Sequence, residues 1–98
     1  MFKQLYSDEL KKLLADANNG LMLLDVRQPY EHDEFHIPGS ILIPLNELPE
    51  RITELENYKD APLVVYCKAG VRSAMACKFL AAHGFNDLTN LADGVMGW

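Results

Sequence analysis

Short apolar runs alternate with segments of helical spacing along the 98 residues of this chain. Residues 21–26 and 63–66 are nearly continuous apolar runs, which are typical of strands covered on both faces. Weaker runs at residues 1–6, 41–44 and 87–91 have the length and apolar content of short strands. The pattern therefore predicts five strands.

Helical segments lie between the predicted strands, and they cover approximately residues 7–17, 29–35, 46–55 and 72–82. Ser7 and Asn46 are the expected N-caps of the first and third helices, and Pro29 opens the second. Residues 18–20, with the sequence NNG, are expected to stop the first helix, and Gly84 the fourth.

Strands that alternate with helices pair in parallel through right-handed crossovers, with helices on both faces of one sheet. Ligands bind such sheets beyond the carboxyl ends of the strands. Asp25 and Cys67 each stand at the end of a buried run, so both are expected at the same edge of the sheet. The chain is predicted to form a single α/β domain over residues 1–98.

Charge and composition narrow the classes of function. The formal net charge of −5 disfavours nucleic-acid binding, which needs clustered Lys and Arg. No apolar run approaches the roughly 20 residues of a membrane span, and the first residues lack the apolar core of a signal peptide. No membrane interaction and a cytoplasmic location are therefore expected. Cys67 and Cys77 suggest neither a disulfide framework nor a four-ligand zinc site, and no metal or cofactor is expected.

The stretch VVYCKAGVRSA, residues 64–74, carries the main candidate chemistry. Cys67 follows a strand, and the next helix starts at about Arg72, so its free N–H groups and positive dipole end point back toward the thiol. Gly70 permits a turn that can form a nest of N–H donors, and Lys68 adds positive charge. Such settings lower a cysteine pKa from about 8.5 to roughly 3.5–7.5. Cys67 is therefore the expected nucleophile, whereas Cys77 lies mid-helix and is expected to pack in the core.

The spacing of the loop favours one kind of anion. Four residues separate Cys67 from Arg72. A C-x₄-R loop can close around one sulfur atom or a small anion, whereas a fifth intervening residue adds up to ~3.6 Å of chain. That longer loop can wrap a phosphoryl group, so the shorter loop favours sulfur chemistry.

Three segments of the chain resemble the single-domain rhodaneses, the thiosulfate sulfurtransferase family. They are LLDVRQPYEHDEFHIPGSILIP, LVVYCKAGVRSAMACKFLAAHGF and LTNLADGVMGW, and they stand in the order of that family from Leu23 onward. The resemblance implies a three-layer α/β/α sandwich around a five-stranded parallel sheet. It also implies that Cys67 takes a sulfane sulfur from a donor such as thiosulfate, and passes it from a persulfide to a thiol or cyanide acceptor. The family's usual Gly-Gly near the end is Asp93-Gly94 here.

The same resemblance implies which residues form the site. Cys67 would be the catalytic residue, and the loop would hold the terminal persulfide sulfur through Lys68, Ala69, Gly70, Val71, Arg72 and Ser73. Arg72 matches the loop-closing arginine of the family. Lys68 stands where the family often has a charged residue that influences the binding of anionic substrates. Expected partners are a small anionic sulfur donor and a thiol acceptor, or a protein persulfide as donor.

Asp25 and Arg27 match the DVR element of the family, which supports the loop. For Arg27, a surface salt bridge with Glu31 or Asp33, worth about 0–1 kcal/mol, is an equally good interpretation.

Two other functions are compatible with the sequence. A thiol phosphatase or arsenate reductase could use the same scaffold, although the loop length disfavours a phosphatase. A rhodanese-like module could also dock a protein without catalysis, and a Cys67 pKa near or above 8.5 would favour that role. Catalysis further requires that the Cys67 side chain is not enclosed in the interior and that the loop amides face it.

Overall fold

The computed structural model describes residues 1–98 and contains one five-stranded parallel sheet in the order β1-β5-β4-β2-β3. The strands are β1 (Lys3–Leu5), β2 (Met22–Asp25), β3 (Ile41–Leu42), β4 (Leu63–Tyr66) and β5 (Leu88–Leu91). The parallel α/β sheet predicted from the sequence is confirmed. The two strands with continuous apolar runs, β2 and β4, lie side by side in the centre, where both faces are covered.

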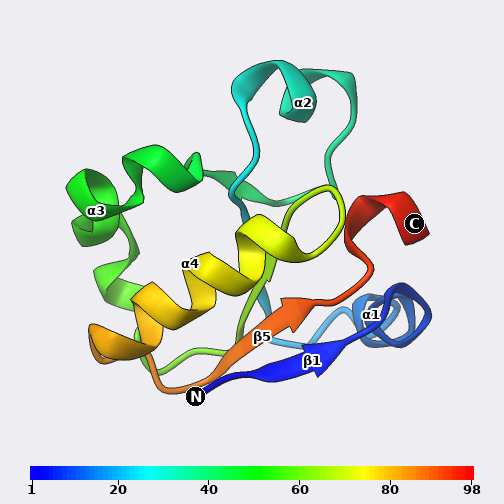
Figure 1. Cartoon of the computed structure of the whole chain (residues 1–98). Helices are drawn as coiled ribbons and strands as arrows, with labels where there is room; N and C mark the ends of the chain where they lie inside the picture. Colours follow the sequence, from blue (N-terminus) through cyan, green and yellow to red (C-terminus); the bar gives the residue numbers. More distant parts are fainter.

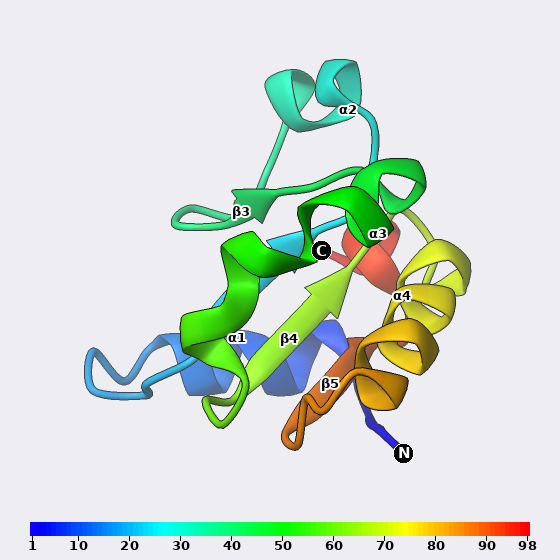
Figure 2. The same ribbon diagram turned by 90° about the vertical axis from the view of Figure 1, so that its left-hand side faces the viewer.

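Helices cover both faces of the sheet. They are α1 (Ser7–Leu14), α2 (Pro29–Glu34), α3 (Leu48–Arg51) and α4 (Val71–Ala82), with the 3₁₀ helices η1 (Leu45–Glu47), η2 (Ile52–Tyr58) and η3 (Gly94–Gly97). Figures 1 and 2 show α3 and α4 on one face, α1 and η3 on the other, and α2 standing beyond the ends of the strands. None of these helices is long and apolar enough to cross a membrane.

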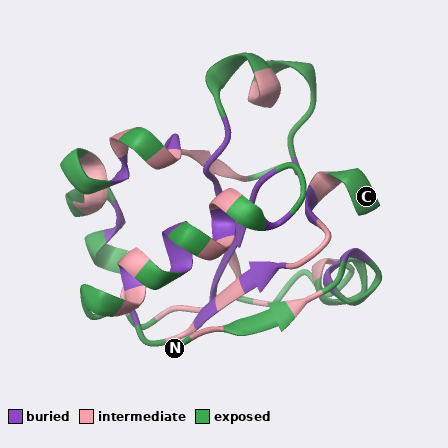
Figure 3. Cartoon of the chain, in the orientation of Figure 1, coloured by how far each residue is buried: buried purple, intermediate pink, exposed green.

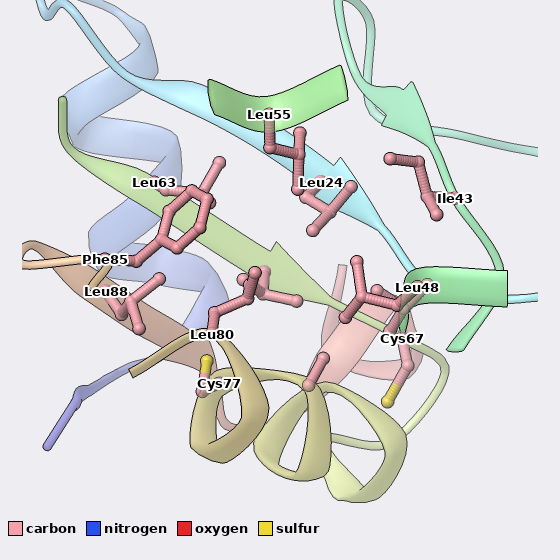
Figure 4. Close-up of a cluster of buried hydrophobic side chains, with 13 residues drawn as sticks. Leu24, Ile43, Leu48, Leu55, Leu63, Cys67, Cys77, Leu80, Phe85 and Leu88 are labelled. Atoms are coloured by element: carbon pink, nitrogen blue, oxygen red, sulfur yellow. The ribbon is translucent and has the colours of Figure 1, made fainter. Parts of the chain in front are cut away.

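The core has two parts, one on each side of the sheet. A cluster of 13 buried residues fills the space between the sheet and α3, η2 and α4 (Figure 4). A smaller cluster of six lies toward α1 and η3. The edge strand β1 is mostly exposed, whereas β4 is buried along its whole length (Figure 3). The loop that follows β4 is therefore fixed at its start by the most deeply packed strand.

Both expected N-caps are wrong. Ser7 is the first residue of α1, and its hydroxyl donates to Asp93 Oδ1 (3.0 Å) instead of closing its own helix. Asn46 lies inside η1, and its Oδ1 accepts from Gln28 Nε2 (3.2 Å). Both side chains bond to residues far away in the sequence. Preferences for N-cap residues are local and cannot predict such partners.

The first helix also ends earlier than predicted, at Leu14 instead of at residues 18–20. The carboxylate of Asp16 accepts from Asn18 N (2.9 Å) and forms a local turn. Such side-chain-to-backbone bonds compete with helix hydrogen bonds.

Candidate active site

The cysteine loop joins the central strand β4 to the helix α4. β4 ends at Tyr66, Cys67 follows it, and α4 begins at Val71. Gly70 precedes the helix with a φ of +91°, a conformation that favours glycine. A Cβ at this position would also lie 2.2 Å from Ala92 O, so only glycine lets the loop pass this close to the end of β5.

The loop directs hydrogen-bond donors at the sulfur of Cys67. Gly70 N lies 3.1 Å and Ser73 N lies 3.4 Å from Cys67 Sγ, and Ser73 Oγ lies 3.3 Å away. The positive end of α4, a helix of 12 residues, lies at the same point. The amides thus face the sulfur, as the sequence analysis requires for catalysis.

These contacts change the acidity of the thiol. Burial favours the neutral form and acts to raise the pKa of Cys67, but hydrogen bonds from the Ser73 hydroxyl and from the amides of Ser73, Ala69 and Gly70 outweigh it, so the pKa is lowered. Burial without such donors raises the pKa of Cys77 to about 12. Figure 4 shows Cys77 among apolar side chains of the core, where its thiol is inert. The two cysteines therefore have opposite chemical character.

The sulfur is covered by its surroundings. Cys67 is only 1% exposed, so the first condition for catalysis, a side chain that is not enclosed in the interior, is not met in this arrangement of the loop. The loop also packs closely against the end of β5 and against Gly94 at the start of η3. A donor has to displace neighbouring side chains or loop atoms to reach Cys67.

The end of the chain holds the carbonyl side of the loop. Val95 N donates to Cys67 O and Met96 N donates to Lys68 O, both at 3.0 Å. Gly94 passes so close that a Cβ there would lie 2.2 Å from Lys68 O. The carbonyls of Cys67 and Lys68 thus bond to η3, while amides of the loop donate to the sulfur. In the sequence, this segment stands out only by its resemblance to the family; a glycine required for close backbone approach is the signal that marks it.

The arginine at the end of the loop is held by a carboxylate. Arg72 Nη1 and Nη2 donate to Glu31 Oε1 and Oε2 at 2.8 and 3.0 Å, which joins α4 to α2. The hydrogen bonds from Arg72 lower the pKa of Glu31 to about 2. The bonds with Glu31 raise the pKa of Arg72, and the Coulomb attraction of Cys67 adds a smaller contribution. The charge of Arg72 is thus neutralised by Glu31, a contact that the sequence did not predict.

Comparisons with known proteins identify the family of the chain. The protein-family model of the rhodanese-like domain matches residues 7–98 of the sequence. The chain belongs to the rhodanese-like family. A protein of Allochromatium vinosum named "Sulfurtransferase" is 34% identical over 98 residues, which is 100% of this chain and 89% of that protein. The crystal structure of a rhodanese-like domain protein from Staphylococcus aureus has a TM-score of 0.89 and 31% identity, and the match covers 99% of this chain and 91% of that one.

A third relative is longer. The "Putative sulfur carrier protein YrkF" of Bacillus subtilis is 34% identical over 90 residues, which is 92% of this chain but only 48% of that protein. The rhodanese-like chain described here therefore corresponds to about half of YrkF.

The DVR element of this rhodanese-like domain forms a buried ion pair. Asp25 is fully buried and Arg27 is 4% exposed. Arg27 Nε and Nη2 donate to Asp25 Oδ1 and Oδ2 at 2.9 and 2.8 Å, and Nη2 also donates to Phe35 O at 2.6 Å. His32 Nδ1 lies 2.8 Å from Asp25 Oδ2. The alternative of a surface salt bridge from Arg27 to Glu31 or Asp33 is wrong, because the guanidinium turns inward to the nearer carboxylate.

A buried polar chain runs from Cys67 to β5. Asn90 Nδ2 donates to Gly70 O (3.2 Å) and to Gln4 Oε1 (3.0 Å), which fixes the amide with its oxygen toward Ser73. Ser73 Oγ donates to Asn90 Oδ1 at 2.5 Å. A hydroxyl has a single proton. The Ser73 hydroxyl therefore donates either to Asn90 or to a Cys67 thiolate, and Asn90 competes with the sulfur for it.

We expect Asn90→Leu to lower the pKa of Cys67 by about 1–2 units, because a released hydroxyl is free to donate to the thiolate and bonds to charged groups are worth roughly 1.5–3 kcal/mol. Titration of the thiolate by its ultraviolet absorbance measures this. In a Ser73→Ala background the Asn90 substitution should leave the pKa unchanged. A pKa that falls equally in both backgrounds contradicts the competition.

A hollow of about 440 Å³ lies beside the loop. Side chains from α2, the loop and η3 line it: Arg27, Tyr30, Glu31, Glu34, Phe35, Lys68, Val95 and Met96. Two cations, two carboxylates and four apolar side chains thus share the surface next to Lys68. Cys67 itself does not line the hollow. Of the hollows on the molecule, this one includes a residue of the cysteine loop, Lys68, in its lining.

Proposed function

We propose that this chain is a sulfurtransferase that carries a sulfane sulfur on Cys67. One observation carries the proposal: Cys67 Sγ lies at the start of α4 and accepts from Gly70 N and Ser73 N at 3.1 and 3.4 Å. This ring of amides stabilises negative charge on sulfur, both on a thiolate and on the terminal sulfur of a persulfide. The relative from A. vinosum that bears the name sulfurtransferase supports the same activity.

The reaction has two steps. The thiolate of Cys67 attacks the outer sulfur of a donor such as thiosulfate; a new S–S bond forms, the S–S bond of the donor breaks, and sulfite leaves with the electron pair. A thiolate or cyanide then attacks the terminal sulfur of the persulfide, and the Cys67 thiolate leaves. The loop from Lys68 to Ser73 binds the transferred sulfur, and Asp25 with Arg27 supports the loop from below.

We also propose that a protein can be the partner in one of these steps. YrkF, which contains a segment similar to this chain, is named a putative sulfur carrier protein. A protein persulfide or a protein thiol would meet the apolar and charged hollow beside Lys68, whose volume of about 440 Å³ exceeds the size of thiosulfate. We treat residues 1–98 as the single domain that performs the transfer.

Incubation of the reduced protein with a panel of sulfur donors is expected to add one sulfur atom, which intact-mass spectrometry detects and peptide mapping places on Cys67. Cyanide should remove it as thiocyanate. Cys67→Ala should gain no sulfur, because the nucleophile is lost.

Cys77→Ala is the matched control and should still load, since the Cys77 thiol is buried and inert. Failure of every donor to load a protein with a free Cys67 thiol contradicts the proposal. Hydrolysis of an aryl phosphate that depends on Cys67 would favour a phosphatase instead.

A further inference from the structure

The charges at the mouth of the cysteine loop, meaning the hollow beside Lys68 together with Arg72, cancel. Arg72 is paired with Glu31 through two hydrogen bonds, and Arg27 is paired with the buried Asp25. Lys68 forms no ion pair, and neither does Glu34, which lines the same hollow. A dianion that enters the hollow therefore meets no net positive charge, in a protein whose total formal charge is −5.

We infer that Glu31 sets the donor specificity of this site: by neutralising Arg72, it makes the mouth of the loop favour sulfane-sulfur donors of low charge, such as alkyl persulfides, over dianionic thiosulfate. The inference rests on the sulfurtransferase function proposed above and specifies the class of donor. The four apolar side chains of the hollow, Tyr30, Phe35, Val95 and Met96, provide contact surface for an alkyl group.

The chemistry of the two donors differs in the charge that the mouth must accept. With an alkyl persulfide R–S–SH, the Cys67 thiolate attacks the terminal sulfur, the S–S bond of the donor breaks, and R–S⁻ leaves with the electron pair while the proton stays on the transferred sulfur. With thiosulfate, a dianion has to enter and the sulfite dianion has to leave. Only the second route requires a surplus of cations, and Glu31 removes the surplus that Arg72 would provide.

The first test needs no sulfur transfer. The alkylation rates of Cys67 with iodoacetate and with iodoacetamide, which differ by one negative charge, are measured in the wild type and in Glu31→Gln. The ratio of the iodoacetate rate to the iodoacetamide rate is expected to rise by roughly 10-fold in Glu31→Gln, at the lower end of the range by which local charge raises the capture of an ion of opposite sign. Added salt should reduce the gain. An unchanged ratio overturns the inference.

The neutral reagent controls for changes in the pKa or the exposure of Cys67, because these affect both rates alike. Glu54→Gln is the matched control variant: it removes the same charge from another arginine–carboxylate pair, that of Glu54 with Arg51, in an exposed position. Its ratio should equal that of the wild type. A rise in Glu54→Gln as large as that in Glu31→Gln would show an effect of total charge alone and would overturn the inference.

The second test compares two donors in loading Cys67: thiosulfate and an alkyl persulfide that has no other charged group. The wild type should load faster from the persulfide, and Glu31→Gln should gain with thiosulfate by a factor similar to that of the alkylation ratio. If neither donor loads the wild type, the sulfurtransferase function fails, while the alkylation ratio still judges the role of Glu31. If thiosulfate loads the wild type as fast as the persulfide does and Glu31→Gln gains nothing, the function stands and the inference is overturned.

Loss of the bridge from α2 to α4 could unfold Glu31→Gln, which circular dichroism would reveal. Two further variants then decide. Glu34→Gln removes an exposed carboxylate without an ion pair from the same hollow and should raise the alkylation ratio by a smaller factor. Lys68→Gln should lower the ratio, because it removes the unpaired cation. An unchanged ratio in both variants overturns the inference.

Discussion

Gly94→Ala is expected to destabilise the protein by roughly 2–5 kcal/mol and to abolish sulfur loading of Cys67. Two costs add up: an alanine at a φ of +59° costs about 1–2 kcal/mol, and overpacking a closed site costs typically 1–3 kcal/mol. The new Cβ would lie 2.2 Å from Lys68 O and 2.6 Å from Cys67 O. The loop can relieve this contact only by moving its carbonyls, and the amides that face the sulfur then move with them.

Thermal unfolding, the pKa of Cys67 and the loading assay measure the three consequences of Gly94→Ala. We expect a lower Tm, a higher Cys67 pKa because the donors are displaced, and little added sulfur. Gly39→Ala is the matched control: Gly39 has a φ of +87°, but a Cβ there would meet nothing within 4 Å. Gly39→Ala should lose only the stability that an alanine at a positive φ costs. The pKa of Cys67 should stay at its wild-type value. Equal effects of the two substitutions on the Cys67 pKa would contradict the role of η3 as a clamp on the loop.

The parts of the site that the sequence predicted are those encoded by neighbours in the chain. The apolar run that became β4, the glycine at position 70 and the start of α4 lie within about 10 residues of each other, so local pattern and turn chemistry were enough to place donors at Cys67. The parallel sheet followed in the same way from the alternation of strands and helices.

The parts that the sequence did not predict depend on contacts between distant segments. Glu31 and Arg72 are 41 residues apart, and Asn90 lies 17 residues beyond Ser73. Glu31 lies in a short polar helix whose sequence is typical of one exposed to solvent. Nothing in its neighbourhood in the sequence indicates that it contacts the loop. The 1% exposure of Cys67 was also not predicted, because it depends on how the folded chain surrounds the loop.

Asp25→Asn is expected to reduce the free energy of unfolding by about 3–5 kcal/mol, because it leaves the buried guanidinium of Arg27 without a countercharge. Asp25 is fully buried, and its two carboxylate oxygens accept from Nε and Nη2 of Arg27. A domain of this size has a total stability of only about 5–15 kcal/mol. Urea unfolding should therefore show a variant close to its stability limit, whereas Glu54→Gln, in an exposed pair, should change the midpoint little.

The double variant Asp25→Asn, Arg27→Gln decides whether the loss comes from an unpaired charge or from altered shape. If the unpaired charge dominates, removal of the guanidinium charge should recover much of the stability. Removal of both charges of a buried pair changes the stability far less than removal of one. The recovery will be incomplete, since Arg27 Nη2 also donates to Phe35 O and anchors the segment after α2. A double variant that is less stable than Asp25→Asn alone would contradict the electrostatic cause and would show that the geometry of the DVR element, independent of its charges, holds α2 beside the loop.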